Sequence, residues 1–592
     1  MKETFPQSIS QKRWVLRAYE ETQVLTFMQK LEVSPTLARL LVMRGHNLES
    51  APGFLAPTLR QHLPDPLLLK DMDKAVTRLV QAITSHEKIV VWGDYDVDGA
   101  TSSALLCRFF KALNLPIALY IPDRIKEGYG PNIPGIQKFI NQGYTVMITV
   151  DCGTTSFEAL DAAGGLDVII LDHHAPEAKL PPAYAIVNPN RLDEQKEMTQ
   201  TLGHLAAVGV SFLCVVALNR ALRESGFYKD HKEPDLMGLL DLVALGTVCD
   251  VMPLTGLNRT FVSQGLKVMA KRKNVGLRAL SDRGGLDESP TPYHLGFVLG
   301  PRINAGGRVG ESFLGARLLS TENPEEASEI AGKLDQYNQD RRILETEALD
   351  QAFLQVDPTS SIIIVDREGW HEGVIGIVAG RLKEKFHKPT AVIAWNEKGI
   401  GKASARSIPG FDFGHLIHKA HHLGYVLGGG GHAMAAGFSL TRDQLPLLTH
   451  FLNSELARLG NEIDLTPMLK CDGYLDLRSL TSGLLKEIEN LSPFGMGNPS
   501  PKFIFSDIMV DSYQLIKDQH IRCRFSQGDG VVVEGIGFRL KDTPLGNTLM
   551  DRSRRPFDLL ASPKLDTWGG KTKITLMIED GALTSSHLRK VG

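Results

Sequence analysis

Acidic and imidazole side chains follow four apolar runs of this sequence. The runs are KIVVWG, VMITV, DVIIL and LVALGTVC, and the side chains that follow them are Asp94, Asp96 and Asp98, then Asp151, then Asp172, His173 and His174, and finally Asp250. Five or six carboxylates could not stay unpaired in one crevice, because burial removes their solvation and like charges repel. Either cations lie between these carboxylates, or the four clusters do not meet in the fold.

The mixture of carboxylate oxygens with one or two imidazoles suits Mn²⁺ or Mg²⁺ better than Zn²⁺. There are enough carboxylates for two ions, and such a pair, about 3.5–4 Å apart, can hold a phosphoryl group from both sides. Cys152 and Cys249 each neighbour a candidate ligand, so a zinc site is an alternative. We expect both cysteines to be buried as small apolar side chains, because neighbours along an extended segment point in opposite directions. For each aspartate taken singly, capping of the next helix is a second alternative.

The elements that must position these residues follow from the spacing of the apolar runs. Strands are predicted within 88–96, 116–123, 144–153 and 166–174, with helices at 99–113, around 203–224 and at 236–247. Continuous Ile/Val runs separated by helices are typical of a parallel α/β sheet that is covered on both faces. In such sheets ligands bind at the carboxyl ends of the strands, where the acidic clusters are found.

The rest of the chain predicts further domains. Residues 321–353 are rich in helix formers and predict a long, exposed connecting helix, after which a second α/β unit begins. Short β-like runs from about residue 460 indicate a small OB-like barrel. The fold class is therefore α/β, with a β-barrel domain at the C-terminal end. The expected boundaries are an N-terminal segment (1–50), a catalytic domain (51–270), a helical connector (271–355), a second α/β domain (356–445) and the OB-like domain (460–592).

Composition narrows the class of protein. The 592 residues are 43% hydrophobic and 22% charged with a net charge of -3, so a polyanion would have to be held by local patches or metals. Six scattered cysteines without a C-x-x-C pair indicate a reduced, intracellular chain. The first residues have no apolar signal core, and we expect a cytoplasmic protein without a membrane partner.

The motifs, taken in order, resemble a known superfamily. DYDVDG, VDCGT, DHH and GTVCDVMPL are similar to the DHH phosphoesterases, and GKASARS with GGGGHAMAAGF is similar to the DHHA1 domain that accompanies one branch of them. The stretches IPDRIKEGYG, GPRINAGGR and GWHEGVIGIVAGRL, with the β-rich tail, extend the resemblance to the RecJ-type exonucleases over most of the chain. No motif acid or histidine departs from the pattern, although the N-terminal segment carries no motif.

The resemblance implies roles for the clustered residues. It assigns two divalent cations, Mn²⁺ or Mg²⁺, to six ligands: Asp94, Asp96, Asp98, Asp151, His173 and Asp250. Asp151 would bridge the ions, while Asp94 either binds metal directly or orients a ligand. Asp151, His173, His174 and Asp172 form the expected catalytic set, with His174 near the scissile phosphate and Asp172 orienting the histidines.

Glycines and cations elsewhere suggest substrate contacts. The run Gly428–Gly431 would let backbone amides approach a phosphate, and His432 would add a donor, although a flexible turn is the simpler alternative. The expected substrate-binding residues are Arg124, Tyr129, Arg302, Arg308, Ser404, Arg406, Ser407, Gly430, Gly431 and His432. Arginine suits a 5′-phosphate, and Tyr129 could stack on a base. Solvated surface arginines are the alternative for Arg124, Arg302 and Arg308.

The function implied by the resemblance is a single-stranded-DNA-specific 5′→3′ exonuclease that releases 5′-mononucleotides by two-metal-ion hydrolysis, in DNA repair and recombination. The expected partners are single-stranded DNA with a free 5′ end, a single-strand-binding protein and a helicase, with the enzyme a monomer. Three alternatives stay open. They are a small-nucleotide phosphoesterase (oligoribonucleotide or cyclic dinucleotide), a non-catalytic replication scaffold that binds DNA, and a zinc hydrolase.

Overall fold

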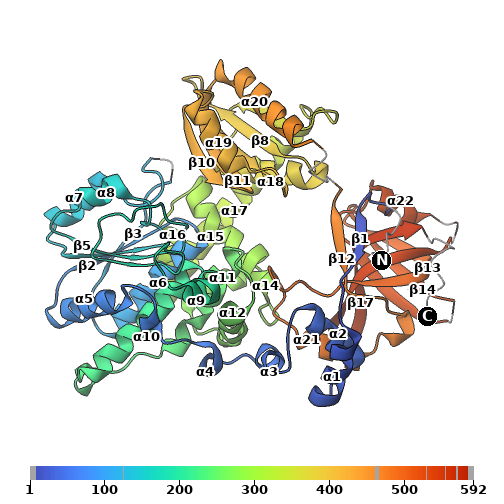
Figure 1. Ribbon diagram of the computed structural model, residues 1–592, viewed down its shortest axis with the longest axis horizontal. Helices are drawn as coiled ribbons and strands as arrows, with labels where there is room; N and C mark the ends of the chain where they lie inside the picture. The colour runs from blue at the N-terminus through green and yellow to red at the C-terminus, as the bar shows by residue number, and fades with distance from the viewer. Residues whose placement is uncertain are drawn as a thin grey trace. The chain divides into compact units, whose positions relative to one another are not determined.

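The computed structural model describes residues 8–124, 126–460, 466–528, 530–551, 553, 555–568 and 571–583. They form two compact units (Figure 1). One unit is His62–Leu465, and the other combines the described parts of Met1–Gln61 and Thr466–Gly592. Among the described residues no single helix is long and apolar enough to cross a membrane, and only the bent pair Lys196–Leu202 and Ala207–Glu224 passes on length and composition.

The first sheet of the larger unit is parallel throughout, as the apolar runs predict. Its strands, in spatial order, are β3 (Ala118–Tyr120), β2 (Ile89–Gly93), β4 (Val146–Val150), β5 (Asp167–Leu171) and β6 (Ala185–Val187). Every residue of β2 and β4 is buried, because helices cover both faces. The three-residue strand β6 was not predicted.

Helices α7 and α8 pack on one face of this sheet, and α6 and α10 contact its strands from the other face (Figure 1). From Met72 to Met269 the α-helices are α5 (Met72–Thr84), α6 (Val97–Ala112), α7 (Ile133–Asn141), α8 (Phe157–Asp161), α9 (Lys196–Leu202), α10 (Ala207–Glu224), α11 (Leu240–Cys249) and α12 (Gly256–Met269). Helix α6 starts very close to the end of β2: a Cβ on Gly99 would lie 2.4 Å from the carbonyl oxygen of Asp94. The acidic turn is therefore held tightly at the sheet edge.

The helical connector contains the predicted long helix, α17 (Pro324–Phe353). The other connector helices are α13 (Val275–Arg283), α14 (Pro292–His294), the π-helix η4 (Leu295–Leu299), α15 (Gly300–Val309) and α16 (Leu314–Ser320). The expectation that the long helix is exposed was wrong for one of its sides. It packs against α13, α15 and α18, because a row of buried small side chains, including Ala327, Ala331 and Ala348, allows close approach.

The second sheet is mixed. Its strand order is β10 (Gly428–His432), β11 (Ala435–Thr441), β9 (Ile400–Arg406), β8 (Thr390–Trp395) and β7 (Ile363–Glu368). Helix α18 (Glu372–Phe386) covers one face, and α19 (Phe413–His422) and α20 (Gln444–Leu459) share the core on the other. The glycine run forms the edge strand β10, so the flexible turn that was the alternative is wrong. The close pairing requires glycine at position 429, because a Cβ there would lie 2.5 Å from the Cβ of Phe438 on the paired strand.

The smaller unit contains the predicted barrel, which is closed in the order β13 (Phe503–Ile516), β14 (His520–Ser526), β15 (Val532–Gly537), β17 (Lys571–Leu583) and β16 (Phe557–Trp568). Helix α22 (Pro544–Met550) lies between β15 and β16 in the sequence, and α21 (Ser482–Glu489) precedes the barrel. The N-terminal segment contributes β1 (Arg13–Leu16), α1 (Glu21–Leu31), α2 (Pro35–Met43) and α3 (Ser50–Leu55), while α4 (Leu59–His62) spans the unit boundary.

The N-terminal segment packs with the barrel. Strand β1 pairs in parallel with β12 (Met468–Cys471), and Phe27 and Leu37 share a core with Phe505 and Phe525 of the barrel. Trp14 donates from Nε1 to the buried Asp580 at 3.0 Å. The segment that carries no motif is thus an integral part of the smaller unit.

Candidate metal centre and anion site

The acidic clusters meet at the carboxyl edge of the first sheet. Asp94 follows β2, Asp151 follows β4 and His173 follows β5, whereas Asp250 ends helix α11 rather than a strand. Nε2 of His173 lies at the centre, 3.3 Å from Asp151 Oδ1, 3.5 Å from Asp250 Oδ2 and 3.9 Å from Asp98 Oδ2. The four clusters, separated by up to 156 residues from Asp94 to Asp250, therefore converge.

Three overlapping groups of side chains have donor atoms within 4.8 Å of one another: Asp94 with Asp96 and Asp151, Asp151 with His173 and His174, and Asp98 with His173 and Asp250. Two of the buried carboxylate oxygens, Asp94 Oδ1 and Asp250 Oδ2, have no hydrogen-bond partner among the described residues. A buried acceptor without a donor is costly unless a cation supplies the missing interaction. The residues present therefore fit hard divalent cations bound through oxygen and imidazole.

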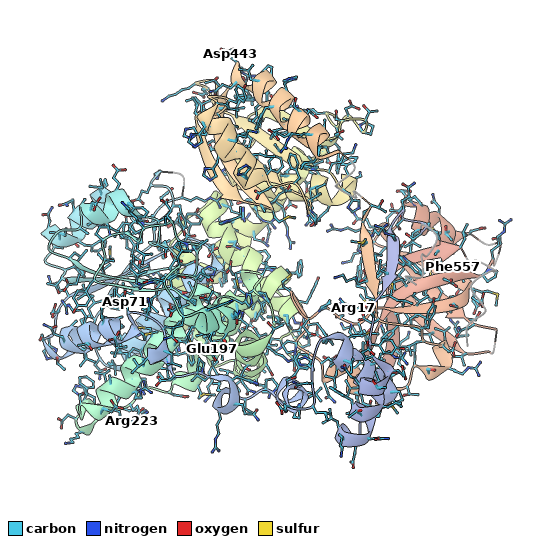
Figure 2. All side chains as sticks on the ribbon, in the orientation of Figure 1. Arg17, Asp71, Glu197, Arg223, Asp443 and Phe557 are labelled. Atoms are coloured by element: carbon cyan, nitrogen blue, oxygen red, sulfur yellow. The ribbon has the colours of Figure 1, made fainter. Side chains whose placement is uncertain are left out.

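Burial and mutual repulsion perturb the carboxylates of this centre. Burial raises the pKa of Asp94, Asp98, Asp151 and Asp250 above the usual range, and neighbouring aspartates raise each of them further. Exposed charges elsewhere have partners of opposite charge. Arg223, near the C-terminal end of α10 (Figure 2), forms an ion pair with Glu233. The protein gathers carboxyl groups here whose ionised form is unfavourable unless a cation lies between them.

Two of the aspartates also cap helices, so the capping alternative was partly correct. Asp96 Oδ1 accepts from the backbone N–H groups of Asp98 at 2.8 Å and Gly99 at 3.1 Å, at the start of α6. Asp98 accepts from the N–H groups of Ala207 at 2.6 Å and Val208 at 3.0 Å, at the start of α10. These bonds orient both carboxylates, and each oxygen keeps a second lone pair for a metal.

The histidines are placed in different protonation states. Burial, and then the charge of His174, lower the pKa of His173 to about 4, so its ring is neutral and can donate a lone pair to a metal. Burial also disfavours charge on His174, but the Asp172 carboxylate, 2.8 Å from its Nδ1, outweighs burial and raises its pKa to about 9. The pKa of Asp172 is held below its usual range, because the bonds from His174 and from the Thr154 backbone outweigh its burial.

The zinc alternative is not supported by the cysteines. The Cys152 thiol lies 3.4 Å from the carbonyl oxygen of Val150, and the Cys249 thiol lies 3.3 Å from that of Leu295. Burial raises the pKa of both thiols, which disfavours the thiolate that zinc would need. None of the donor groups found among the described residues contains a cysteine.

Several of the expected substrate-binding residues gather in a group of arginines. Burial lowers the pKa of Arg308 to about 10, and the charges of Arg124, Arg341 and Arg406 lower it further. Arg308 donates to the carbonyl of Gly373 on α18 at 3.0 Å, and Arg406 on β9 donates to Ser404 Oγ at 3.1 Å. The guanidinium of Arg124 lies over the ring of Tyr95, 5.0 Å from its centroid. We call Arg124, Arg308, Arg341 and Arg406 the arginine cluster.

Tyr129 connects this region to the metal centre. Its hydroxyl donates to the backbone carbonyl of Asp151 at 2.9 Å, and its ring stands edge-on to those of Tyr95 and His174. Asp151 itself has a φ of 59°, a backbone conformation that aspartate tolerates better than most side chains. The Tyr129 hydroxyl therefore helps to fix this turn, while its half-exposed ring remains available to a ligand.

Other expected contacts are not brought to this region. Arg302 pairs with Asp335 Oδ1 at 2.9 Å and bonds the carbonyl of Val298, so its guanidinium ties α15 to α17. The buried Ser407 donates to the carbonyl of Phe411 and closes a turn. Gly430, Gly431 and His432 do lie on the sheet that holds Arg406: they belong to the exposed edge strand β10, and His432 and Arg406 both pair with Ala435 of β11. We therefore drop Arg302 and Ser407 as substrate contacts.

Sequence reasoning missed Tyr95 and Arg341. Tyr95 lies between two acidic motif residues, and only its contact with Arg124 shows a role. Arg341 is buried on α17, where it bonds Glu345 and Asn338, and its Nε has no partner among the described residues. In the sequence it belongs to a charged helix and looks like a solvated residue, so no local signal could have found it.

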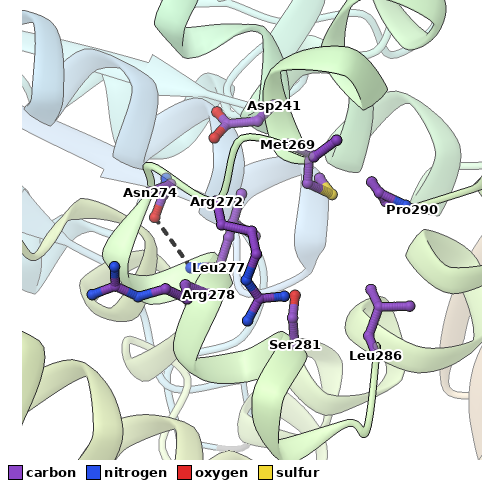
Figure 3. Close-up of a pocket in the computed structure, with 10 residues that line it drawn as sticks. Asp241, Met269, Arg272, Asn274, Leu277, Arg278, Ser281, Leu286 and Pro290 are labelled. Atoms are coloured by element: carbon purple, nitrogen blue, oxygen red, sulfur yellow. Dashed lines mark hydrogen bonds between the residues drawn. The ribbon is translucent and has the colours of Figure 1, made fainter. Parts of the chain in front are cut away.

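A small cavity elsewhere in the larger unit is distinct from the metal centre. It has a volume of about 40 Å³ and is lined by residues that include Asp241, Met269, Asn274, Leu277 and Ser281 (Figure 3). Asp241 lies at the first turn of α11, opposite the helix end that carries Asp250, and is almost fully buried. Helix α11 therefore carries a second buried carboxyl, outside the metal centre.

Comparison with known proteins now identifies the family. The N-terminal domain of the DHH family matches residues 88–247, the DHHA1 domain matches 359–458 and the RecJ OB domain matches 471–580. The single-stranded-DNA-specific exonuclease RecJ of Bacillus subtilis is 32% identical over 98% of this chain and 72% of its own length. The chain belongs to the RecJ family.

Other members of the RecJ family agree with this assignment. The Escherichia coli single-stranded-DNA-specific exonuclease RecJ is 33% identical over 93% of this chain and 96% of its own length. The crystal structure of RecJ from Thermus thermophilus in complex with Mn²⁺ superposes with a TM-score of 0.81 at 27% identity, covering 97% of this chain and 80% of that one. A Mg²⁺ complex of the same protein gives a TM-score of 0.75.

Proposed function

We propose that this chain is a metal-dependent exonuclease that degrades single-stranded DNA from a 5′ end and releases 5′-mononucleotides. The observation that carries the proposal is the convergence of Asp98, Asp151 and Asp250 around Nε2 of a neutral His173, with Asp94 and Asp96 grouped beside Asp151. Membership of the RecJ family supports the choice of substrate. The resemblance of the motifs to those of RecJ-type exonucleases supports the 5′→3′ polarity.

We assign metal binding to the six residues expected from the sequence, Asp94, Asp96, Asp98, Asp151, His173 and Asp250. When bound, two divalent cations would supply Lewis-acid stabilisation of a phosphodiester and lower the pKa of water. His174, cationic at neutral pH, would donate a hydrogen bond to an oxygen of the scissile phosphate. Asp172 would hold that ring in place through its Nδ1, as it does here at 2.8 Å.

The arginine cluster would bind the 5′-terminal phosphate. Without an anion, Arg308 is repelled by the other three members, and burial makes the charges of Arg308 and Arg406 more costly. A phosphate would satisfy several N–H donors at once and remove this repulsion. Ser404 would support Arg406 through the bond that the two already share, and β10, with Gly430, Gly431 and His432, would offer exposed donors to the same nucleotide.

The barrel would provide a separate surface for the single strand. On β14, Arg522 and Arg524 are exposed and alternate with the buried Ile521, Cys523 and Phe525, so both arginines point outward from the barrel. OB barrels bind single strands through such outward-facing cationic side chains. We assign catalysis to residues 62–270 of the expected catalytic domain, since residues up to Gln61 belong to the smaller unit, and strand binding to the barrel domain from residue 466 onward. A monomer that works with a helicase and a single-strand-binding protein is also part of the proposal.

Labelled oligonucleotides test the proposal directly. Single- and double-stranded 30-mers carrying a label at the 5′ or 3′ end are incubated with Mn²⁺, Mg²⁺ or EDTA. We expect the 5′ label to leave first as a mononucleotide, from single strands only, and no cleavage in EDTA. Faster turnover of a dinucleotide than of the 30-mer would favour the small-nucleotide phosphoesterase instead, and saturable DNA binding without any cleavage would favour the scaffold.

A further inference from the structure

Two aromatic side chains of the connector are unusually exposed. Tyr293 and Phe297 are 64% and 66% exposed, the largest values for any tyrosine or phenylalanine of the described residues. Their rings stack on each other at a centroid distance of 5.1 Å and an interplanar angle of 24°. Covering exposed apolar rings with another flat apolar surface is favourable, because it removes apolar area from water. The pair is therefore a ready platform for a planar ligand.

The platform is held rigidly. Tyr293 belongs to the short helix α14 and Phe297 to the π-helix η4, a rare conformation that is frequent at functional sites. Nδ1 of His294 accepts from the backbone N–H of Thr291 at 3.1 Å. Leu295 and Leu299, at the two ends of η4, are fully buried and hold this segment against the core. The exposed rings thus project from an anchored turn.

The segment that carries the two rings contacts Cys249, the residue before the proposed metal ligand Asp250. The carbonyl oxygen of Leu295 lies 3.3 Å from Sγ of Cys249, and a Cβ on Gly300 would lie 2.5 Å from the same sulfur. Cys249 precedes Asp250, so η4 packs against the end of α11 that enters the metal centre. Val251, on the other side of Asp250, is 65% exposed and has a φ of 58°, which a β-branched side chain rarely adopts. An exposed apolar residue is kept there despite this strain.

We propose that Tyr293 and Phe297 form a stacking platform for nucleobases of a single strand that passes into the metal centre. The inference rests on the proposed function and deepens it. Every base has a flat face, so the contact tolerates any sequence, as an exonuclease requires. In a duplex the faces of the bases are already covered by their neighbours, so the same platform would favour single strands.

The test combines protein variants with abasic DNA. Binding of a fluorescent single-stranded 20-mer is measured in EDTA, which prevents cleavage, for the wild type and for Tyr293→Ala/Phe297→Ala. The 20-mer is then replaced by a series in which one abasic nucleotide is moved along the strand. Tyr293→Phe/Phe297→Tyr keeps both rings and serves as the conservative variant. Tyr184→Ala removes another half-exposed ring, 44% exposed, that lies just before β6.

We expect the double alanine variant to bind about tenfold more weakly than the wild type. An abasic nucleotide at one or two positions should weaken wild-type binding by a similar factor and leave the alanine variant unaffected, because each change removes the same contact. The conservative variant and Tyr184→Ala should bind like the wild type. Unchanged binding by the double alanine variant would overturn the platform. So would an abasic nucleotide that, at every position, weakens binding of this variant as much as it weakens binding of the wild type. If the wild type itself neither binds nor digests single strands, the proposed function fails instead.

Discussion

The metal centre and the arginine cluster are built on the same principle with opposite charge. In the first, burial and neighbouring carboxylates raise the pKa of Asp94, Asp98, Asp151 and Asp250. In the second, burial and neighbouring guanidinium groups lower the pKa of Arg308. Each region keeps like charges together with few opposite charges, among them the His174 ring beside Asp172 in the first and Glu345 beside Arg341 in the second. The metal centre therefore has the character of a cation site, and the arginine cluster has that of an anion site. A metal-dependent enzyme that acts on DNA needs both, one for its metal ions and one for a phosphate of the DNA.

The regions differ in how the chain supplies them. The acids come mostly from the ends of adjacent strands of one sheet. Because β2, β4 and β5 are parallel neighbours, the residues that follow them lie side by side. The arginines come from a loop, α15, α17 and β9, which belong to three parts of the larger unit. The acidic region depends on one sheet, whereas the arginine cluster depends on the docking of several elements.

Replacing Asp151 should break the acidic side of this comparison with the largest effect. In Asp151→Ala we expect cleavage of single-stranded DNA to fall by at least about a thousandfold, because the proposed bridging ligand is lost. DNA binding should stay within a few-fold, since the arginine cluster is untouched. Single-turnover digestion and equilibrium binding measure the two effects. Asp161→Ala, an exposed aspartate at the end of α8, is the matched control. Near-normal turnover with saturating Mn²⁺ would refute the ligand assignment.

Replacing Arg406 should break the basic side and leave the acidic side intact. In Arg406→Gln we expect the KM for 5′-phosphorylated strands to rise about 10- to 100-fold, because hydrogen bonds to a charged group are lost. The KM for 5′-hydroxyl strands should change much less. Steady-state kinetics on both substrates measures the difference. Arg367→Gln, an exposed arginine of β7, is the control, and equal effects on both substrates would argue against a phosphate site.

Removing divalent cations should show the repulsion within the acidic region as a change in stability. Mn²⁺ at a hundredfold excess over its Kd should stabilise the folded protein by about 3 kcal/mol per site, and EDTA should remove this gain. In EDTA, Asp151→Asn should unfold at a higher temperature than the wild type, because one repelling charge is gone, and it should gain less from Mn²⁺. Differential scanning fluorimetry follows both trends. If the melting temperature of the wild type is the same with Mn²⁺ and with EDTA, the assignment of the metal ligands is contradicted.

The buried Asp241, outside both regions, should give a small, pH-dependent effect. Burial raises its pKa to about 6, although Arg108 opposes the shift. Because the folded state holds the proton more tightly than the unfolded state, this group lowers stability as the pH rises from about 4 to about 6, and its cost is constant above that. Asp241→Asn should therefore be about 1–3 kcal/mol more stable than the wild type at pH 8 and equal to it near pH 4. Urea unfolding at both pH values tests this; a pH-independent difference would contradict it.

The fold could be predicted where local patterns repeat. The Ile/Val runs of β2, β4 and β5 identify buried parallel strands, and the unbroken helix formers of α17 identify a long helix. The strand β6 was missed because three apolar residues do not make a pattern. The strand β10 was not predicted. Glycine disfavours strands, and the run indicated either a backbone that approaches a phosphate or a flexible turn. Pairing with β11 needs only the backbone and leaves no room for a side chain at Gly429.

The candidate site was predictable in the same uneven way. The acids stand out because four separate apolar runs are each followed by carboxylates or imidazoles, although a single such aspartate often caps a helix. Arg302 and Arg308 look alike in GPRINAGGR, but they are six residues apart on α15, which places them on different sides of the helix. One therefore meets Asp335, and the other meets Gly373 and the other arginines.

The amino-acid sequence alone determined that this chain has a parallel sheet edged with carboxylates, a long helix and a C-terminal barrel, because strand ends, helix periods and charges next to apolar runs are local properties. Only the tertiary structure decided that Nε2 of His173 lies at the centre of the acids, that Arg341 joins Arg308, and that the N-terminal segment shares a core with the barrel. These contacts join residues far apart in the chain, and their geometry depends on how whole elements pack.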